Sequence, residues 1–441
     1  MSTGLPDVFT VVPFGSSVHA TLHIAGSKSI ANRALICAAL ADGTSVVRNL
    51  PSGDDTVAML HCLEELGVRS VMAIAKTGSE VGAAGGTVTV DGQPTLHAEP
   101  GVTLFAGLAG TTSRFVAAVA ALASVPLVID GRGPLRQRPF GPLFDALRQM
   151  GVDVITGERA GGLPVTVIGP PTSGLVRMPG NVSSQFVTAL MLIGPYVEGG
   201  LRIELTTALV SRPYVELTKS TMAAFGFTDV EVGERHIAVG AGVYQPTDLF
   251  VEPDASSASY PLAVAALVGG SVTIPGLGRR ALHGDARFAD VLAEMGCIVQ
   301  RDYVSVTVSR DPVVALRGVH IDMADISDLV PTLAVVAACA ATPTTISGVG
   351  FIRNKESDRL RDLSAELRKA GVSIDELDDG LHIRPSLATL HPARLATHHD
   401  HRLAMAFGVL GALVPGIEVE SPAVVSKSWP EFWTVLEELR Q

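Results

Sequence analysis

Lysine, arginine and hydroxyl side chains stand at the start of an Ala-rich segment near the amino terminus. Ser27, Lys28 and Ser29 follow Gly26, and Arg33 comes one turn later. If the Ala-rich segment is a helix, its free N–H groups and partial positive charge attract anions. These residues predict an anion-binding site, although capping would explain each hydroxyl and a solvated position would explain each cation. A nucleotide-binding P-loop is excluded, because the glycine spacing that precedes its lysine is absent.

A second group of chemically active side chains lies in the densest charged run of the chain, residues 353–360. It reads RNKESDRL, between a Gly-rich turn and an amphipathic segment. This run places acid, amine and guanidinium groups together at a helix entrance. A solvated helix start is the alternative explanation.

Three histidines, His398, His399 and His401, suggest a metal site at first sight. Neither an HExxH motif nor a His–carboxylate ligand spacing accompanies them. We therefore interpret His401, which lies between Asp400 and Arg402, as structural or as a hydrogen-bonding group beside a substrate.

The elements that must position these side chains recur along the chain. Ala-rich segments of helical character begin at intervals of about 72 to 84 residues, and they are expected to be buried because they are apolar all round. Each begins at a residue of N-cap type, and these residues are Ser27, Thr111, Ser183, Ser256, Asp328 and Asp400.

Each Ala-rich helix is followed by a β-like segment, an amphipathic helix and, in five units, an alternating strand. In one amphipathic helix, Phe288, Val291, Leu292 and Met295 fall on one face. The sixth unit lacks the closing strand, and residues 18–24 alternate in the way required to supply it. This organisation predicts a discontinuous domain (1–26 and 250–441) and an inserted domain (27–249), joined by a double hinge. The alternative is a large α/β core without true repeats.

Composition excludes several classes of protein. Hydrophobic residues make up 47% of the chain and charged residues only 17%, below the roughly 25% of a typical domain, which favours a large buried core. The net charge of -11 argues against a nucleic-acid or anionic-membrane surface. The amino terminus lacks the pattern of a signal peptide, the apolar runs are short for a membrane span, and the four cysteines form no CxxC pair. We expect a cytoplasmic protein.

Seven motifs together carry a family resemblance. They read, in chain order, GSKSIANRAL, GLAGTTSRF, QRPFGPLFDAL, GNVSSQFVTAL, DASSASY, KESDRL and DHRLAMAF. This set resembles the EPSP synthase family (3-phosphoshikimate 1-carboxyvinyltransferases) and covers nearly the whole chain. The resemblance implies a two-domain inverse α/β barrel with three βαβαββ units in each domain and the active site in the cleft between them. It also implies inhibition by glyphosate.

The resemblance assigns roles residue by residue. It assigns shikimate-3-phosphate binding to Lys28, Ser29, Arg33, Ser183, Ser184, Ser211, Asp328 and Lys355. It assigns phosphoenolpyruvate binding to Lys28, Gly110, Arg138, Gln185, Arg359, Arg402 and Lys427. The catalytic residues would be Asp328 as proton acceptor, Glu356 as proton donor, and Lys28, while Tyr214 would support the shikimate side. Three residues depart from the family pattern, namely Leu108, Phe115 and Phe351.

The implied reaction explains these residue types. Both substrates carry a phosphate and a carboxylate, which the cations would bind. Addition of a hydroxyl to phosphoenolpyruvate, followed by loss of phosphate, needs a base and an acid but no metal or organic cofactor. We expect a monomer acting on two small molecules. Two alternatives remain, a UDP-N-acetylglucosamine enolpyruvyl transferase and a non-catalytic anion-binding module. The family of the first alternative resembles GSKNA at the first motif and usually has a cysteine in the loop matching residues 131–138, whereas this chain has GSKSIANR and no cysteine in that loop.

Overall fold

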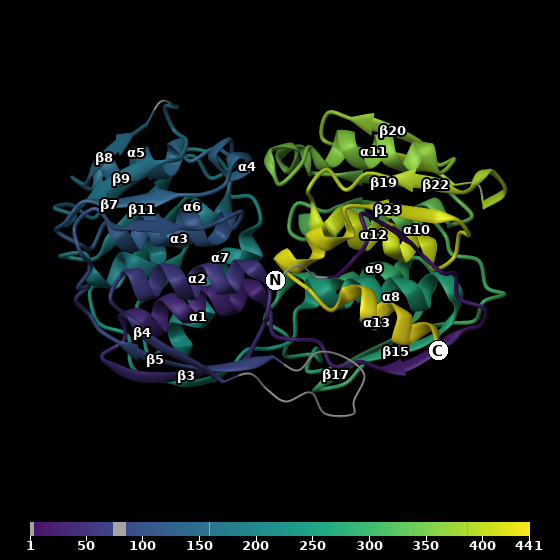
Figure 1. Cartoon of the computed structure of the whole chain (residues 1–441), viewed down its shortest axis with the longest axis horizontal. Helices are drawn as coiled ribbons and strands as arrows, with labels where there is room; N and C mark the ends of the chain where they lie inside the picture. Colours follow the sequence, from purple (N-terminus) through teal and green to yellow (C-terminus); the bar gives the residue numbers. More distant parts are fainter. Residues whose placement is uncertain (1–3, 74–84, 158, 386) are drawn as a thin grey trace. The chain divides into compact units, whose positions relative to one another are not determined.

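The computed structural model describes residues 4–73, 85–157, 159–385 and 387–441. These residues form two compact units, one containing residues 4–25 and 252–441, the other residues 26–73 and 85–251. Each unit has a hydrophobic core of its own. Each unit contains three repeats of one β-α-β-α-β-β plan, except that the sheet of the sixth repeat has three strands instead of four (Figure 1).

The unit formed by residues 26–251 contains the first three repeats. The first comprises β14 (Asp248–Phe250), α1 (Lys28–Leu40), β3 (Gly43–Leu50), α2 (Asp54–Glu65), β4 (Arg69–Ala73) and β5 (Gly86–Gly92). The second comprises β6 (Thr103–Phe105), α3 (Gly110–Ala120), β7 (Leu127–Asp130), α4 (Gly133–Arg136), α5 (Gly141–Gln149), β8 (Asp153–Thr156) and β9 (Val165–Ile168). The third comprises β10 (Leu175–Met178), α6 (Ser184–Ile193), β11 (Leu201–Leu205), α7 (Arg212–Ala224), β12 (Val230–Val232) and β13 (His236–Val239).

The other unit contains the last three repeats. The fourth comprises β2 (Val18–Thr21), α8 (Ala255–Val268), β15 (Gly270–Pro275), α9 (Phe288–Glu294), β16 (Ile298–Arg301) and β17 (Ser305–Arg310). The fifth comprises β18 (His320–Asp322), α10 (Val330–Ala338), β19 (Thr344–Ser347), α11 (Arg359–Lys369), β20 (Ser373–Leu377) and β21 (Gly380–Arg384). The sixth comprises β22 (Ala393–Leu395), α12 (His401–Gly411), β23 (Ile417–Glu420), α13 (Phe432–Arg440) and β1 (Val8–Thr10).

Every repeat pairs its strands in the same way. The two strands on either side of the Ala-rich helix are parallel, and the closing strand, where present, is antiparallel to its neighbours. Parallel strands need a crossover connection, which the buried helix provides in the second, third, fifth and sixth repeats. In the first and fourth repeats, the parallel partner strands β14 and β2 come from a distant part of the chain. Figure 1 shows the sheet of β3, β5 and β4 beside α1, the helix that it covers.

The buried helices confirm the predicted apolar segments. Residues 255–267 of α8 are all buried, as are residues 330–338 of α10 and 401–411 of α12. Alanine favours the helix and lets neighbouring helices approach closely, which explains its excess in these segments. In the amphipathic α9, Phe288, Val291 and Leu292 are buried as predicted, together with Met295 at its end.

Three of the six expected N-caps are confirmed, those of Ser27, Ser183 and Asp400, whose side chains accept backbone N–H bonds. The other three predictions are wrong by one to two residues. Helix α3 begins after Ala109, so Thr111 lies inside it, and α8 is capped by Asp254, not by Ser256. Asp328 lies in a 3-10 turn, Ser327–Leu329, immediately before α10, and its carboxylate binds side chains instead of capping.

The prediction for the closing strand of the sixth repeat is also wrong. β1 supplies this strand, with Phe9 opposite Val419 in an antiparallel pair. The alternating segment that begins at Val18 forms β2 instead, which pairs in parallel with β15 in the fourth repeat. Alternation identifies a half-buried strand but does not select its neighbour, because both sheets offer an apolar face.

Asn49 ties together the places where the chain enters and leaves the unit of residues 26–251. Its backbone carbonyl accepts a hydrogen bond from Gly26 N at 2.9 Å, and its Nδ2 donates to Val251 O at 2.9 Å. Its φ of 60° lies in the left-handed region, which asparagine tolerates better than most residues. A Cβ on Gly26 would lie 2.0 Å from Asn49 O, so only glycine fits beside it.

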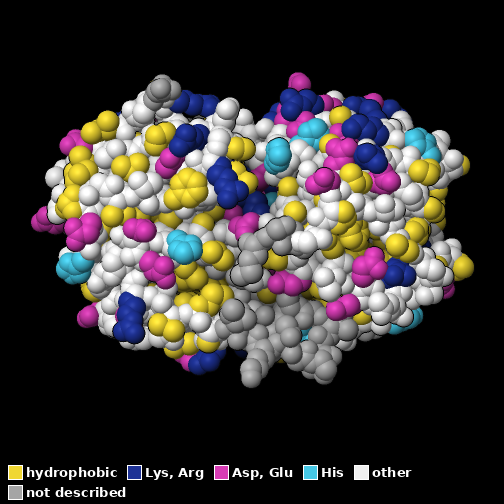
Figure 2. All heavy atoms as spheres, in the orientation of Figure 1, with side chains coloured by type: hydrophobic (Ala, Val, Ile, Leu, Met, Phe, Trp, Pro, Cys, Tyr) yellow, Lys and Arg dark blue, Asp and Glu magenta, His cyan; other side chains and the backbone are white. Residues whose placement is uncertain are grey.

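No helix in the part of the chain that the structure describes is long and apolar enough to cross a membrane. All four cysteines are buried free thiols. Figure 2 shows basic and acidic side chains interspersed over α11, so that this face carries no patch of a single sign.

Candidate active-site residues

Lys28 is the first residue of α1, where a cation opposes the helix dipole. Its ammonium binds the carboxylate of Asp55 at 3.0 Å, and both side chains are largely buried. Asp55 belongs to the first turn of α2, and its backbone carbonyl accepts a hydrogen bond from Thr112 of α3 at 3.0 Å. The starts of α1, α2 and α3 therefore meet at Lys28, and Asp55 is a partner that the sequence analysis did not identify.

Gly110 and Arg138 are in direct contact. A Cβ on Gly110 would lie 2.4 Å from Nη1 of Arg138 and 2.9 Å from its Cζ, closer than real Cβ atoms come. Glycine at the start of α3 thus leaves space for a guanidinium group beside the helix N-terminus. This pairing combines the positive end of the dipole with a full charge.

The amide of Gln185, at the start of α6, is fixed in orientation by two partners. Its Oε1 accepts a hydrogen bond of 2.5 Å from Nη1 of Arg114, and its Nε2 donates to Oγ1 of Thr111 at 3.2 Å. Arg114 is itself buried between the rings of Phe140 and Phe186. Arg114 follows the GTT motif in the sequence, but residue type alone did not identify it as the residue that positions Gln185.

Arg33 is buried more deeply than a substrate ligand needs to be. Its guanidinium donates to Thr218 Oγ1, Thr188 Oγ1 and the backbone carbonyls of Ser29 and Tyr214, at 2.7–3.3 Å. Burial lowers the pKa of Arg33 to about 10 and outweighs the opposing effects of Tyr214 and Cys37. The group remains charged at neutral pH, and most of its donors bind α1, α6 and α7. Phe115, a departure from the family pattern, lies 5.4 Å from it in a cation–π contact.

Two serines of the predicted shikimate side lie at the start of α6. Ser183 caps α6 through Gln185 N at 3.3 Å, and Ser184 is the first residue of the helix. Ser211 precedes α7 with a φ of 52°, which is uncommon outside glycine. Such backbone conformations persist where the surroundings impose them, often at functional sites.

Six predicted residues of the other unit form one ion-pair network centred on Arg359, the first residue of α11. Its Nη1 donates to Asp328 at 2.8 Å and its Nη2 donates to Glu356 at 2.9 Å. Arg402 donates to the second oxygen of Asp328 at 2.7 Å. Two lysines complete the network, Lys355 at 3.8 Å from Asp328 and Lys427 at 3.7 Å from Glu356.

The network determines the protonation of Asp328. Burial by itself would raise the pKa of this carboxyl, but Arg402, Lys355 and Arg359 outweigh it and hold the pKa well below its ordinary value. Asp328 is therefore ionised at neutral pH. Burial tends to lower the pKa of Arg359, but Asp400, Glu356 and Asp328 raise it above its ordinary value, so this guanidinium is permanently charged.

Asp400 and Ser357 complete the surroundings of Arg359 and were not among the predicted site residues. Asp400 is fully buried and accepts a hydrogen bond of 2.7 Å from Nε of Arg359. Ser357 donates to the same carboxylate at 3.2 Å. His401, beside Asp400, is buried, and Phe351 lies under the ammonium of Lys355 at 5.9 Å.

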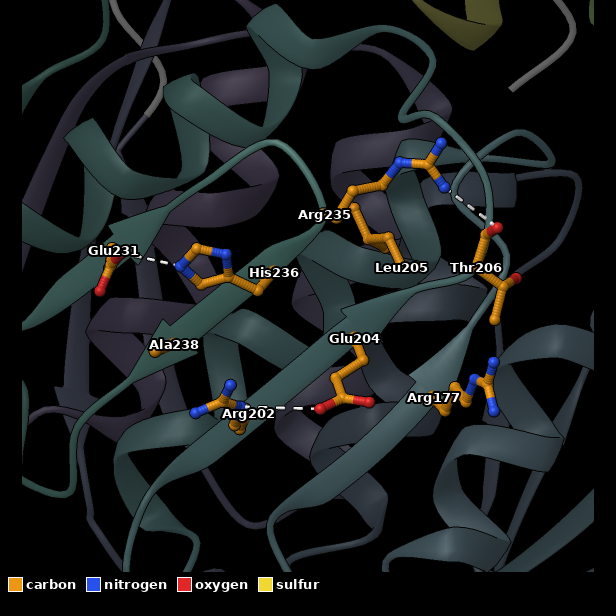
Figure 3. A pocket seen from close by; sticks show the side chains of 9 residues that line it. All are labelled: Arg177, Arg202, Glu204, Leu205, Thr206, Glu231, Arg235, His236 and Ala238. Atoms are coloured by element: carbon orange, nitrogen blue, oxygen red, sulfur yellow. Dashed lines mark hydrogen bonds and ion pairs between the residues drawn. The ribbon is translucent and has the colours of Figure 1, made fainter.

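Residues predicted to bind ligands do not line the pocket in Figure 3, which lies on the sheet β10–β11–β13–β12. Two glutamates oppose its basic groups, with Glu231 2.8 Å from His236 and Glu204 3.9 Å from Arg202. These paired side chains are largely exposed, whereas Arg359 and Asp328 are largely buried.

One side chain of the histidine cluster, His398, contacts a carboxylate. Nε2 of His398 lies 2.9 Å from Glu366, a buried carboxylate of α11 that also binds Lys369. Within the described ranges, no group of three or more His, Cys, Asp or Glu side chains is arranged to hold a metal ion.

Chemically, the network around Arg359 combines three carboxylates, those of Asp328, Glu356 and Asp400, with four cations. Anions of small molecules compete with Asp328 and Glu356 for the same donors, so binding and proton transfer are coupled there. In the unit of residues 26–251, Lys28, Arg138 and Gln185 present donors at the starts of three helices.

Comparison with known proteins extends over almost the whole chain. A family model described as EPSP synthase (3-phosphoshikimate 1-carboxyvinyltransferase) matches residues 13–436. A 3-phosphoshikimate 1-carboxyvinyltransferase of Nostoc punctiforme is 38% identical over 432 residues, which cover 97% of this chain and 98% of that protein. Another, from Edwardsiella ictaluri, is 40% identical over 416 residues, 93% of this chain and 94% of that protein.

Solved structures share the fold. An EPSP synthase from Acinetobacter baumannii superposes with a TM-score of 0.81 at 24% identity, over 98% of both chains. The enolpyruvyl transferase NikO from Streptomyces tendae gives a TM-score of 0.76 at 19% identity, over 98% of this chain and 97% of that one. At these identities the likeness concerns the fold, and it confirms the predicted two-domain α/β architecture. Because the family model and the relatives extend over nearly its full length, the chain belongs to the EPSP synthase family.

Proposed function

We propose that the chain transfers the enolpyruvyl group of phosphoenolpyruvate to the 5-hydroxyl of shikimate-3-phosphate, releasing phosphate. The observation that carries this proposal is the pair of carboxylates, Asp328 and Glu356, that share one buried guanidinium, Arg359. An addition–elimination reaction needs an acid and a base near the same anionic substrate. Membership of the EPSP synthase family supports the choice of substrates.

In the first step, Asp328 accepts the proton of the 5-hydroxyl, and the hydroxyl oxygen forms a bond to C2 of phosphoenolpyruvate. The electron pair of the C2–C3 double bond takes a proton from Glu356 at C3. In the second step, the bond from C2 to the phosphate oxygen breaks and the departing phosphate takes the proton held by Asp328. A proton leaves C3 to Glu356, and the double bond forms again. Glu356 thus changes from acid to base between the two steps.

Binding of the substrate prepares Asp328 for this role. Without ligand, Arg402, Lys355 and Arg359 hold the pKa of Asp328 low, so that the carboxylate is a weak base. A phosphate or carboxylate of the substrate shares these two guanidinium groups and weakens their hold on Asp328. The pKa of Asp328 then rises towards the range in which a carboxylate accepts protons effectively.

The remaining assignments follow the family motifs. Lys28, Gly110, Arg138, Gln185, Arg359, Arg402 and Lys427 are proposed to bind phosphoenolpyruvate. Lys28, Ser29, Arg33, Ser183, Ser184, Ser211, Asp328 and Lys355 are proposed to bind shikimate-3-phosphate. Because each set draws on both ends of the sequence, we propose that the two units act on one pair of substrates. We further propose a cytoplasmic monomer, and the free thiols suit a reducing compartment.

Release of phosphate from phosphoenolpyruvate tests the proposal. With shikimate-3-phosphate as acceptor, the wild-type chain should release phosphate, whereas UDP-N-acetylglucosamine should give no release above background. Asp328→Asn should abolish most of the activity. Asp375→Asn is the matched control, because Asp375 also binds an arginine, Arg384, but on the exposed surface of β20. Release with the nucleotide sugar alone would contradict the proposal.

A further inference from the structure

The carboxylate of Asp400 is the common anchor of two arginines. It is fully buried and accepts hydrogen bonds from Nε of Arg359 at 2.7 Å and from its Nη2 at 3.4 Å. It also accepts from the backbone N of Arg402 at 2.9 Å and from Oγ of Ser357 at 3.2 Å. Four donors from three residues therefore converge on the carboxylate of Asp400. The family motifs assign no substrate-binding role to this residue.

This anchoring determines which edge of Arg359 faces the reacting groups. Asp400 occupies the edge formed by Nε and Nη2, and the terminal nitrogens Nη1 and Nη2 reach Asp328 and Glu356. A planar guanidinium has only a few ways to be gripped by a carboxylate, so holding one edge fixes the direction of the others.

A second route leads from Asp400 to the same base. As the N-cap of α12, Asp400 fixes the first turn from which the side chain of Arg402 extends. Arg402 binds Oδ2 of Asp328, while Arg359 binds Oδ1. Both oxygens of Asp328 are therefore held by residues that Asp400 anchors.

We propose that Asp400 is a positioning residue for enolpyruvyl transfer, which orients Arg359 and Arg402 so that the acid and the base are held in register around phosphoenolpyruvate. This inference rests on the proposed function. A purely structural cap is the competing explanation. It accounts for the bond from Arg402 N but not for the two bonds from Arg359 or the bond from Ser357.

Asp254 provides a matched control within the same unit. Its carboxylate caps α8 through Ser256 N at 2.9 Å and Ser257 N at 3.4 Å. An Asp-to-Asn change retains an oxygen that can cap a helix, so Asp400→Asn and Asp254→Asn keep the cap and lose the charge. Only Asp400→Asn removes the partner of a guanidinium that is proposed to bind phosphoenolpyruvate.

Steady-state kinetics of the two variants separate the explanations. For Asp400→Asn we expect KM for phosphoenolpyruvate to rise at least about tenfold with a fall in kcat, while KM for shikimate-3-phosphate stays within about threefold. For Asp254→Asn we expect both KM values within about twofold of wild type. Loss of active protein through misfolding would lower kcat and leave KM unchanged. Unaltered KM values in Asp400→Asn, or equal changes in both variants, would overturn the proposal.

Ser357→Ala is the second test if Asp400→Asn does not fold, as judged by circular dichroism. It removes one donor to Asp400, and kcat/KM for phosphoenolpyruvate should fall roughly two- to tenfold. A value equal to wild type would contradict the proposal. The wild-type chain is assayed alongside, because failure of the wild type to use shikimate-3-phosphate would refute the proposed function itself and not the role of Asp400.

Discussion

Gly110→Ala is a single added methyl group whose effect can be worked out from the structure. The new Cβ would lie 2.4 Å from Nη1 of Arg138, whereas an ordinary contact is about 3.4 Å or longer. The guanidinium must therefore move away by about 1 Å. A charge-assisted hydrogen bond of about 2.8 Å to phosphoenolpyruvate would then exceed the hydrogen-bonding range.

Losing one such bond to a charged group costs about 1.5–3 kcal/mol. At about 1.4 kcal/mol for each factor of ten, kcat/KM for phosphoenolpyruvate should fall by roughly 10- to 100-fold. KM for shikimate-3-phosphate should change little. Because glyphosate is expected to compete with phosphoenolpyruvate, its inhibition constant should rise in the variant as well.

Gly141→Ala is the matched control for this change. Gly141 is also the first residue of a helix, α5, and a Cβ there meets no atom within 4 Å. Its kinetic constants and glyphosate inhibition should equal those of the wild type. Wild-type kinetics in Gly110→Ala would refute the inferred clash with Arg138. Full wild-type activity at millimolar glyphosate would refute the expected competition.

Four further predictions concern charged side chains and the response of the chain to shikimate-3-phosphate. Lys28→Ala should lose most phosphate release with little change in Tm, and unchanged release would refute its place in the site. Glu356→Gln and Asp328→Asn should each lower kcat by about 10²–10⁴-fold. If either variant keeps half of the wild-type turnover, the residue that it replaces is not an acid or base in the reaction. The pKa of Asp328 is lower in the folded chain than its ordinary value of about 3.9, so the ionised carboxylate stabilises the fold at pH values above that ordinary value. This stability is lost as the pH falls through the lower pKa of the folded chain. When acid unfolding is followed by circular dichroism, Asp328→Asn should therefore lose less stability than the wild type. Shikimate-3-phosphate should lower the radius of gyration in solution scattering, and an unchanged curve at saturation would contradict a hinge closure.

Several features of the fold follow from local sequence. The apolar character of α8 on all sides predicts its burial, and the periodic face of α9 predicts its packing, because both depend on residues close together in the chain. The starts of helices are less certain from sequence, since Thr111 and Ser256 are good caps that the structure places inside helices. Several residues of N-cap type near a helix start can each take the N-cap position, and residue type alone does not select among them.

Long-range pairings could not be predicted in the same way. The motif DHR contains Asp400 as an N-cap candidate, but its bond to Arg359 joins residues 41 positions apart. Similarly, the bond between Arg114 and Gln185 spans 71 positions. The strand at Val18 shows the same limit, because its pattern predicts a strand and its partner depends on the path of the whole chain.

Transfer in deuterium oxide tests the proposed addition–elimination most directly. Addition places a deuteron on C3 of the enolpyruvyl group, giving a methyl group from which any of three hydrogens can leave. When the chain catalyses the reaction of phosphoenolpyruvate with shikimate-3-phosphate in deuterium oxide, mass spectrometry should therefore find deuterium at C3 of the enolpyruvyl product. Glu356→Gln should form this product far more slowly. A product without deuterium, or no enolpyruvyl product, would contradict the proposal.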